Sequence, residues 1–145
     1  MSERWLHLVL AAWAGSVWTI CGIVAPSLFA VLPERQVAGE VAGYFFRVST
    51  WLGLALGCIA LALAAVSKRG SKRNFALISL AALAPVVSEL IVRPWMESAR
   101  AAGDMARFGM LHGVSALLFG ITCLCTAMLV WRSTQSHASG NTMRG

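Results

Sequence analysis

Four polar side chains in the second half of the chain could bind an ion. Glu89 and His112 each lie within an otherwise apolar run. Arg93 follows Glu89 by four residues, which places both on one face of a helix. Ser115 follows His112 by three residues, which places these two residues on one face of a helix as well. Because an ionisable group inside a long apolar helix is costly, it is by default a candidate functional residue. We therefore predict a polar cluster that binds or passes a small cation or metal ion, formed by Glu89, Arg93, His112 and Ser115.

A structural role is the alternative for the same residues. Glu89 can pair with Arg93 and close the end of a helix, and His112 can hydrogen-bond a backbone carbonyl. Three methionines surround the cluster, and their thioethers would suit copper(I). Their irregular spacing favours packing instead; they are Met96, Met105 and Met110.

The amino-acid composition is that of an integral membrane protein. Of the 145 residues, 58% are hydrophobic and 12% are charged, and the mean hydropathy is +0.71. A soluble domain carries about 25% charged residues. The net charge of +6 could indicate a nucleic-acid partner. The basic residues, however, lie in short segments between apolar runs, as they do in membrane proteins. We expect the lipid bilayer, and no nucleic acid, as the partner.

Four apolar segments are long enough to cross a membrane, which takes about 20 residues per helix. They cover residues 5–31, 45–66, 75–92 and 108–131. A cleaved signal peptide is the alternative for the first segment, because Arg4 precedes it. The apolar part of a signal peptide is only about 7–15 residues long, so we favour a retained helix. Pro26 is expected to kink its far half. The sequence predicts an all-α, four-helix transmembrane bundle.

Two segments outside these spans carry signals of their own. Between the first and second spans, Pro33 and Glu34 suit the first turn of a helix, and Val37, Val41 and Tyr44 share one face. We predict a short interfacial helix there, within residues 32–47. The chain after Arg132 is polar and rich in small residues. We predict a membrane domain of residues 1–132 and a disordered cytoplasmic tail of residues 133–145.

Small residues recur at four-residue spacing in the second and fourth spans. Such spacing lets helices approach closely in lipid. We predict that five glycines pack helices together, within the chain or in a homo-oligomer: Gly53, Gly57, Gly109, Gly113 and Gly120.

The four cysteines all fall within apolar runs, which argues against a disulfide framework. We interpret Cys21, Cys58, Cys123 and Cys125 as small buried hydrophobic residues. Cys123 and Cys125 would lie about 200° apart around a helix, a poor geometry for one shared metal.

The distribution of positive charge predicts the orientation in the membrane. Residues 67–74 hold four basic residues and no acidic one. Together with Arg4, Arg132 and Arg144, they place seven of the twelve basic residues on one side. The other five, which include Arg47 and Arg93, lie on the opposite side. We predict a multi-pass protein of a bacterial-type inner or plasma membrane, with both termini in the cytoplasm.

The two histidines within the spans are weak candidates for metal ligands. His7 lies near the cytoplasmic end of the first span, and His112 near the outer end of the fourth. Because the hydrocarbon core is about 30 Å thick, they cannot bind the same metal or haem iron within one chain. We expect no cofactor, with haem or copper as the alternative in an oligomer. Glu89 and His112, by contrast, are expected at a similar depth of about 5–6 Å below the outer interface.

The chain resembles the transmembrane protein 205-like family of small integral membrane proteins. The resemblance rests on WLHLVLAAWAGSVW, VAPSLFAVLPERQVAGEVAGYFFR, VRPWM and FGMLHGVS, and covers roughly residues 5–131. It implies a four-helix membrane protein without an established enzyme activity. The first span is also similar to the copper resistance protein D group, through His7, Trp13 and Gly15.

Three functions remain open from the sequence. The first is a non-enzymatic membrane protein that binds or moves a small cation or metal at the outer polar cluster. The second is a haem- or copper-associated redox component, and the third is a structural subunit of a larger membrane complex. The chain has none of the common hydrolase, metalloprotease or phosphate-loop motifs, which favours a function without catalysis.

Overall fold

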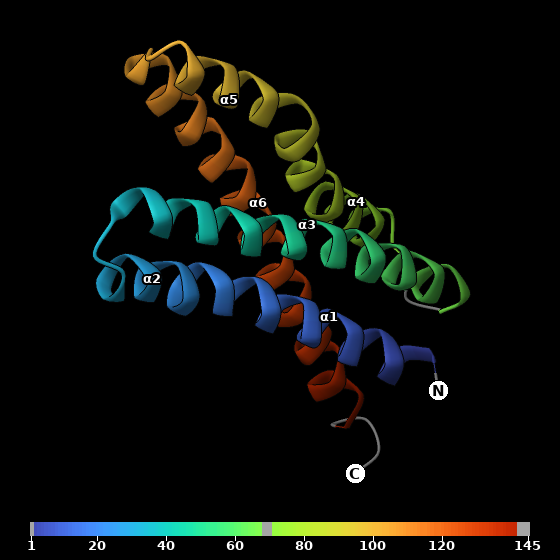
Figure 1. Ribbon diagram of the computed structural model, residues 1–145. Coiled ribbons are helices and arrows are strands. Elements are labelled where there is room, and N and C mark those ends of the chain that lie inside the picture. Colours follow the sequence, from blue (N-terminus) through green and yellow to red (C-terminus); the bar gives the residue numbers. More distant parts are fainter. Residues whose placement is uncertain (1, 68–70, 142–145) are drawn as a thin grey trace.

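Two helical hairpins cross one another in the computed structural model (Figure 1). The structure describes the backbone of residues 2–67 and 71–141 and the side chains of residues 3–67 and 71–134. The first hairpin consists of α1 (Ser2–Thr19), the π-helical turn η1 (Ile20–Val24), α2 (Ala25–Val31) and α3 (Arg35–Val66). The second consists of α4 (Lys72–Val87), the π-helical turn η2 (Ser88–Val92), α5 (Arg93–Ala101) and α6 (Met105–Asn141). The helices α1, α3, α4 and α6 pack together at the crossing. Towards the turns between paired helices, α2 and the start of α3 diverge from α5 and the start of α6 (Figure 1).

Each π-helical turn lies just before a proline. Pro26 is the second residue of α2, and Pro94 is the second residue of α5. Proline has no N–H, and its ring clashes with the carbonyl four residues earlier. In both turns the backbone N–H that follows donates to a carbonyl five residues back, so the helix widens there. The helix thus passes through each proline without ending, and the predicted disturbance at Pro26 is a π turn.

The helices extend beyond the apolar segments that predict them. Residues 32–47 do not form a separate interfacial helix, because Arg35–Val66 is one unbroken helix. The chain between Arg93 and Arg107 is mostly helical, with its turn at residues 102–104 and Gly103 at φ 72°. The helix α6 continues to Asn141, so residues 133–141 are helical rather than disordered, and residues 142–145 lie outside the described part. Hydropathy predicts where the membrane ends, whereas Arg, Gln and Glu are good helix formers that can continue a helix into water.

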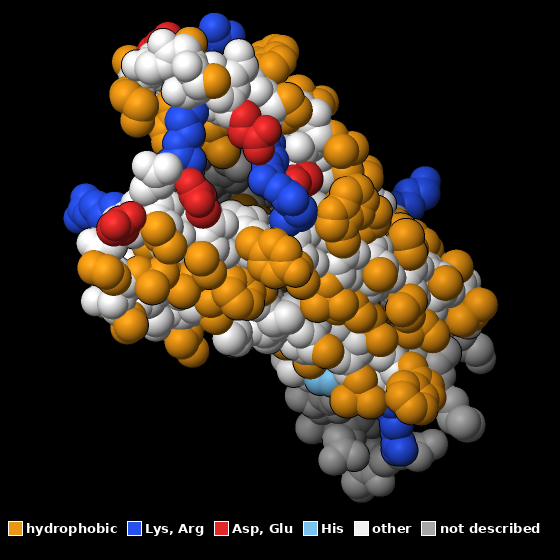
Figure 2. All heavy atoms as spheres, viewed as in Figure 1, with side chains coloured by type: hydrophobic (Ala, Val, Ile, Leu, Met, Phe, Trp, Pro, Cys, Tyr) orange, Lys and Arg blue, Asp and Glu red, His pale blue; other side chains and the backbone are white. Residues whose placement is uncertain are grey.

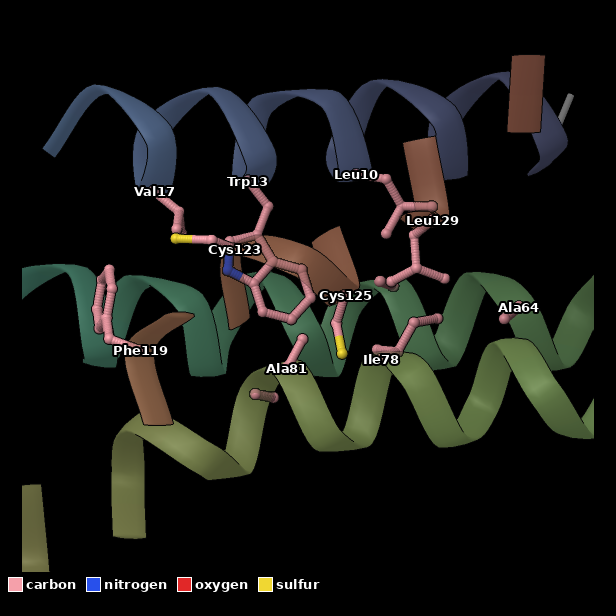
Figure 3. Close-up of a cluster of buried hydrophobic side chains, with 12 residues drawn as sticks. Leu10, Trp13, Val17, Ala64, Ile78, Ala81, Phe119, Cys123, Cys125 and Leu129 are labelled. Carbon is pink, nitrogen blue, oxygen red and sulfur yellow. The ribbon is translucent and has the colours of Figure 1, made fainter. Parts of the chain in front are cut away.

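The fully buried ring of Trp13, in α1, lies at the centre of the core. It packs on Gly53 and Gly57 of α3. A Cβ atom at Gly57 would lie 2.8 Å from the Ala82 Cβ of α4 and 3.2 Å from the Trp13 ring. Two carbon atoms normally pack about 3.5–4.0 Å apart, so only glycine fits at this crossing. Figure 3 shows the ring pointing from α1 toward Ala81 of α4.

The three glycines of α6 have a different environment. A Cβ atom added at Gly109, Gly113 or Gly120 would meet nothing within 4 Å among the described residues. Gly109 and Gly113 are also exposed. These three residues therefore do not pack helices within the chain, and their role in a homo-oligomer stays a prediction.

Hydroxyl groups join α4 and η2 to α6. The Thr122 hydroxyl donates to the Ala81 carbonyl at 3.0 Å, and the hydroxyls of Ser88 and Ser115 form a hydrogen bond. Thr122 and Ser88 are buried. Hydrogen bonds between helices in lipid contribute about 0.6 kcal/mol on average. The serine pair holds η2 against α6 and so positions the residue after Ser88.

Four stretches of the described chain are helical, long and apolar enough to cross a membrane: Glu3–Val31, Arg35–Val66, Lys72–Ala101 and Met105–Thr134. Large apolar side chains cover most of the face seen in Figure 2. Five of the six tryptophans are exposed, which is unusual for a protein surrounded by water. The protein is an integral, multi-pass membrane protein, and the predicted all-α four-helix bundle is confirmed.

Candidate functional site

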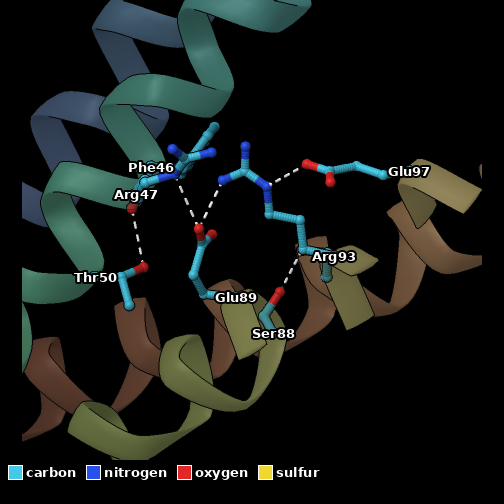
Figure 4. Close-up of polar contacts among 8 residues, drawn as sticks. Phe46, Arg47, Thr50, Ser88, Glu89, Arg93 and Glu97 are labelled. Carbon is cyan, nitrogen blue, oxygen red and sulfur yellow. Dashed lines mark hydrogen bonds and ion pairs between the residues drawn. The ribbon is translucent and has the colours of Figure 1, made fainter. Parts of the chain in front are cut away.

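Two arginines and two glutamates form a charged network where the hairpins diverge (Figure 4). Glu89, in η2, is at its centre. Its Oε1 atom lies 2.6 Å from Nη1 of Arg93 and 2.9 Å from Nε of Arg47. Nε of Arg93 also lies 2.8 Å from Oε1 of Glu97. Arg47 belongs to α3, while the other three residues belong to the second hairpin, so the network connects the two hairpins.

The local sequence explains how the second hairpin positions its three residues. Glu89, Arg93 and Glu97 follow one another at four-residue spacing along η2 and α5, which favours consecutive ion pairs. Glu89 lies within the π-helical turn that precedes Pro94. Such turns are frequent at functional sites. Ser88, one residue earlier, is held against α6, which leaves Glu89 directed toward α3.

The network is partly shielded from solvent. The exposed fraction of the side chain is 18% for Glu89, 26% for Arg93 and 42% for Arg47, and rises to 64% for Glu97. Figure 2 shows Lys or Arg and Asp or Glu side chains around a hollow between the diverging ends, on a face that is otherwise mostly apolar. A partly shielded ionic group interacts more strongly than one on an open surface. The network is therefore partly shielded and still open to solvent.

Hydrogen-bond donors outnumber acceptors in this network. Each guanidinium group has five N–H donors, yet Arg47 and Arg93 share one oxygen atom of Glu89. Nε of Arg47 is buried, and its N–H is not aligned with that oxygen, so their contact is an ion pair without a hydrogen bond. The four residues of the network are formally neutral together, whereas Arg47, Glu89 and Arg93 alone carry about +1. The imbalance at Glu89 is therefore an excess of donors over acceptors.

The structure places the predicted cluster residues in three different environments. Glu89 and Arg93 are in contact, as their spacing suggests. Ser115 instead bonds Ser88 beneath the network. His112 is exposed and stacks on Phe108, with the ring centroids 6.2 Å apart. It does not join the cluster, because the face of α6 that packs on η2 is centred on Leu111 and Ser115.

His7 and His112, the two histidines within the spans, lie near opposite ends of the membrane-spanning part of α6. His7 contacts the Ser133 hydroxyl at 2.7 Å. Ser133 is 21 positions after His112 in the same helix, which corresponds to roughly 30 Å at 1.5 Å per residue. One metal or haem iron cannot bind both within a chain. Among the described residues, no group of three His, Cys, Asp or Glu side chains is placed to hold a metal ion.

Two residues of the network, Arg47 and Glu97, are absent from the cluster that the sequence predicts. Arg47 lies 42 positions before Glu89, and no local spacing connects them. A signal was present, because the charge distribution places Arg47 and Arg93 on the same side of the membrane. Glu97 follows Arg93 by four residues and could have been found by extending the helical spacing of the cluster.

The comparison with protein families matches residues 8–104 to a domain of unknown function, DUF4149. The chain belongs to the DUF4149 family. Neither curated proteins nor solved structures give a match. The DUF4149 segment contains all four residues of the charged network and ends before Ser115. The more specific resemblance to the transmembrane protein 205-like family stays a prediction.

Proposed function

We propose that this membrane protein binds an anionic phosphate or carboxylate group in the hollow between its hairpins, with Arg47 and Arg93 as the binding residues. The observation that carries the proposal is the convergence of two guanidinium groups, one from each hairpin, on a single carboxylate oxygen. A ligand with several acceptor oxygens would supply what the network lacks.

The geometry of arginine suits this role. A guanidinium group binds phosphate or carboxylate through two parallel N–H bonds. The ion pairs join Nε of Arg47 and Nη1 and Nε of Arg93 to carboxylates. Each guanidinium group has five N–H donors, so a ligand that enters the hollow can bind further donors of both arginines beside Glu89.

The sequence alone favours a small cation as the ligand. The contacts of Glu89 with Arg47 and Arg93 favour an anion instead. A cation that binds Glu89 would lie beside two guanidinium groups and be repelled by both. It would bind only if Arg47 and Arg93 moved away from the carboxylate. An anion is attracted by the same two groups as they stand.

The ligand can come from two sources with the same chemistry. Residues 48–66 and 75–88 carry no charge, so Arg47 and Glu89 mark the boundary of the apolar part of their helices. Lipid phosphates lie at that depth, and soluble anions reach it from water. The distribution of basic residues predicts that this boundary faces away from the cytoplasm.

Binding to purified protein in a neutral detergent tests the proposal. The probes are phosphatidylglycerol, phosphatidylcholine and inorganic phosphate, with retained lipid counted by native mass spectrometry and phosphate binding measured by calorimetry. We expect phosphatidylglycerol to be retained over phosphatidylcholine if the ligand is a lipid headgroup, and phosphate to bind if it is a soluble anion. Because a charge-assisted hydrogen bond contributes about 1.5–3 kcal/mol, Arg47→Gln or Arg93→Gln should weaken binding by about tenfold or more.

Two variants make the test specific. Arg100→Gln is the matched control, because Arg100 lies on α5, is exposed and stacks over Phe108 rather than joining the network. It should leave binding unchanged. Glu89→Gln separates the two ligand classes: it should strengthen anion binding by removing a competing carboxylate, whereas it would abolish binding of a cation. Equal losses in all three arginine variants, or no preference for any anion, would overturn the proposal.

A further inference from the structure

A second pair of side chains also joins the two hairpins, and it lies inside the apolar core. The Sγ atoms of Cys21, in η1, and Cys123, in α6, are 3.6 Å apart. All four cysteines are free thiols in this structure. Figure 3 shows Cys123 directed toward α1 beside Val17, whereas Cys125 points toward α4 near Ile78. Only the first of these two α6 thiols is therefore placed to react across the hairpins.

The two sulfur atoms are in non-bonded contact. A disulfide has an S–S length of about 2.05 Å, so the Sγ atoms need to approach by roughly 1.5 Å. Cys21 lies in the π-helical turn, where the helix is already widened ahead of Pro26. Forming the bond therefore requires a shift of that turn or a rotation of the two side chains.

The two thiols differ in accessibility. Cys21 is half-buried, and Cys123 is 7% exposed. An oxidant dissolved in the bilayer therefore meets Cys21 first, while Cys123 is shielded and adjacent. A sulfenic acid formed on one thiol can condense with an adjacent second thiol to give a disulfide.

We propose that Cys21 and Cys123 form a reversible cross-link in response to hydroperoxides in the membrane. The Cys21 sulfur attacks the terminal oxygen of the hydroperoxide and the O–O bond breaks. That oxygen stays on Cys21 as a sulfenic acid, and the remaining alkoxide takes the thiol proton and leaves as an alcohol. The Cys123 sulfur then displaces that oxygen, which leaves as water with the thiol proton, and the S–S bond forms. The protein is oxidised by two electrons and the hydroperoxide is reduced by two.

The cross-link would fix the hairpins at their crossing. It ties η1 of the first hairpin to α6 of the second. It closes a loop of about a hundred residues, and loops of that length constrain the unfolded chain strongly. This inference is independent of the proposed anion site.

Thiol counting in lipid nanodiscs tests the proposal. In the variant Cys58→Ser with Cys125→Ser, cumene hydroperoxide should reduce the thiols available to a maleimide reagent in denatured protein from two to none. Dithiothreitol should restore both. The matched control, Cys21→Ser with Cys123→Ser, keeps Cys58 and Cys125 and should retain both thiols at the same dose. The melting temperature of the oxidised protein should rise by several degrees and fall again on reduction.

A second measurement does not depend on how these variants fold. Non-reducing peptide mapping of the oxidised wild-type protein should recover one peptide pair linked through Cys21 and Cys123. The proposal is overturned if both thiols stay available, if they are lost only to linkage between chains, or if they gain oxygen without linking.

Discussion

Adding one methyl group at Gly57 should separate α3 from α4. The new Cβ would lie 2.8 Å from the Cβ of Ala82 and 3.2 Å from the Trp13 ring. The Ala82 atom is attached directly to the backbone of α4, so no side-chain rotation can relieve the contact. The two helices must move apart by several tenths of an ångström, or the buried Trp13 must shift with them.

The size of the effect follows from two opposing contributions. Overpacking a close-packed core costs about 1–3 kcal/mol. Replacing glycine by alanine in a helix gains about 0.8–1 kcal/mol, because alanine restricts the unfolded backbone. Gly113→Ala is the matched control, since a Cβ there meets nothing within 4 Å. Subtracting the control removes the helix-propensity contribution, so Gly57→Ala should be about 1–3 kcal/mol less stable than Gly113→Ala.

Reversible unfolding in mixed detergent micelles measures this difference. Sodium dodecyl sulfate is added to protein in dodecyl maltoside, and helix content and tryptophan fluorescence are followed together. A difference of 2 kcal/mol corresponds to about a thirtyfold change in the unfolding constant. Gly53→Ala should fall between the other two, because its nearest neighbour, at 2.9 Å, is the Trp13 indole nitrogen, a side-chain atom that is not fixed directly to a backbone as the Cβ of Ala82 is. If Gly57→Ala proves as stable as Gly113→Ala, the packing of α1, α3 and α4 described above is wrong.

Three further predictions use the same unfolding assay. Glu89→Gln should lower the free energy of unfolding by about 1–2 kcal/mol, because two partly shielded guanidinium groups lose their partner; added phosphate should restore part of it, and a neutral effect without phosphate would contradict the network. A double-mutant cycle of Ser88→Ala and Ser115→Ala should give a coupling energy of about 0.6 kcal/mol and at most about 1.7, while additive effects would show that their hydrogen bond contributes nothing. His112→Ala should change stability by less than about 0.5 kcal/mol, since the ring is exposed, and a larger loss would place His112 in a contact that the structure lacks.

Much of the architecture follows from local features of the sequence. Long uncharged runs indicate four spans because every backbone polar group in lipid must be paired within a helix. The spacing of Glu89 and Arg93 indicates their contact for the same reason, since four residues make about one helical turn. The prediction of a separate interfacial helix is wrong, because a fall in hydropathy marks the end of an apolar segment and not the end of a helix.

Which residues form the charged network depends on how the helices pack against one another. Arg47 reaches Glu89 only because α3 crosses η2 at one particular height and rotation. His112 faces outward for the converse reason, although it lies three residues before Ser115 in the same helix. The pairing of Cys21 with Cys123 likewise joins two helices that are about a hundred residues apart in the chain.

The sequence by itself determined that this is a four-span membrane protein and which residues share a face of each helix. Only the tertiary structure decided which face meets which neighbour. Glycines illustrate the distinction: Gly53 and Gly57 meet Trp13 at a crossing, while Gly109 and Gly113 have the same spacing and face outward. The physical reason is that backbone hydrogen bonds are local and set the helical period. The rotation of each helix about its axis, by contrast, results from packing side chains of all four helices at once.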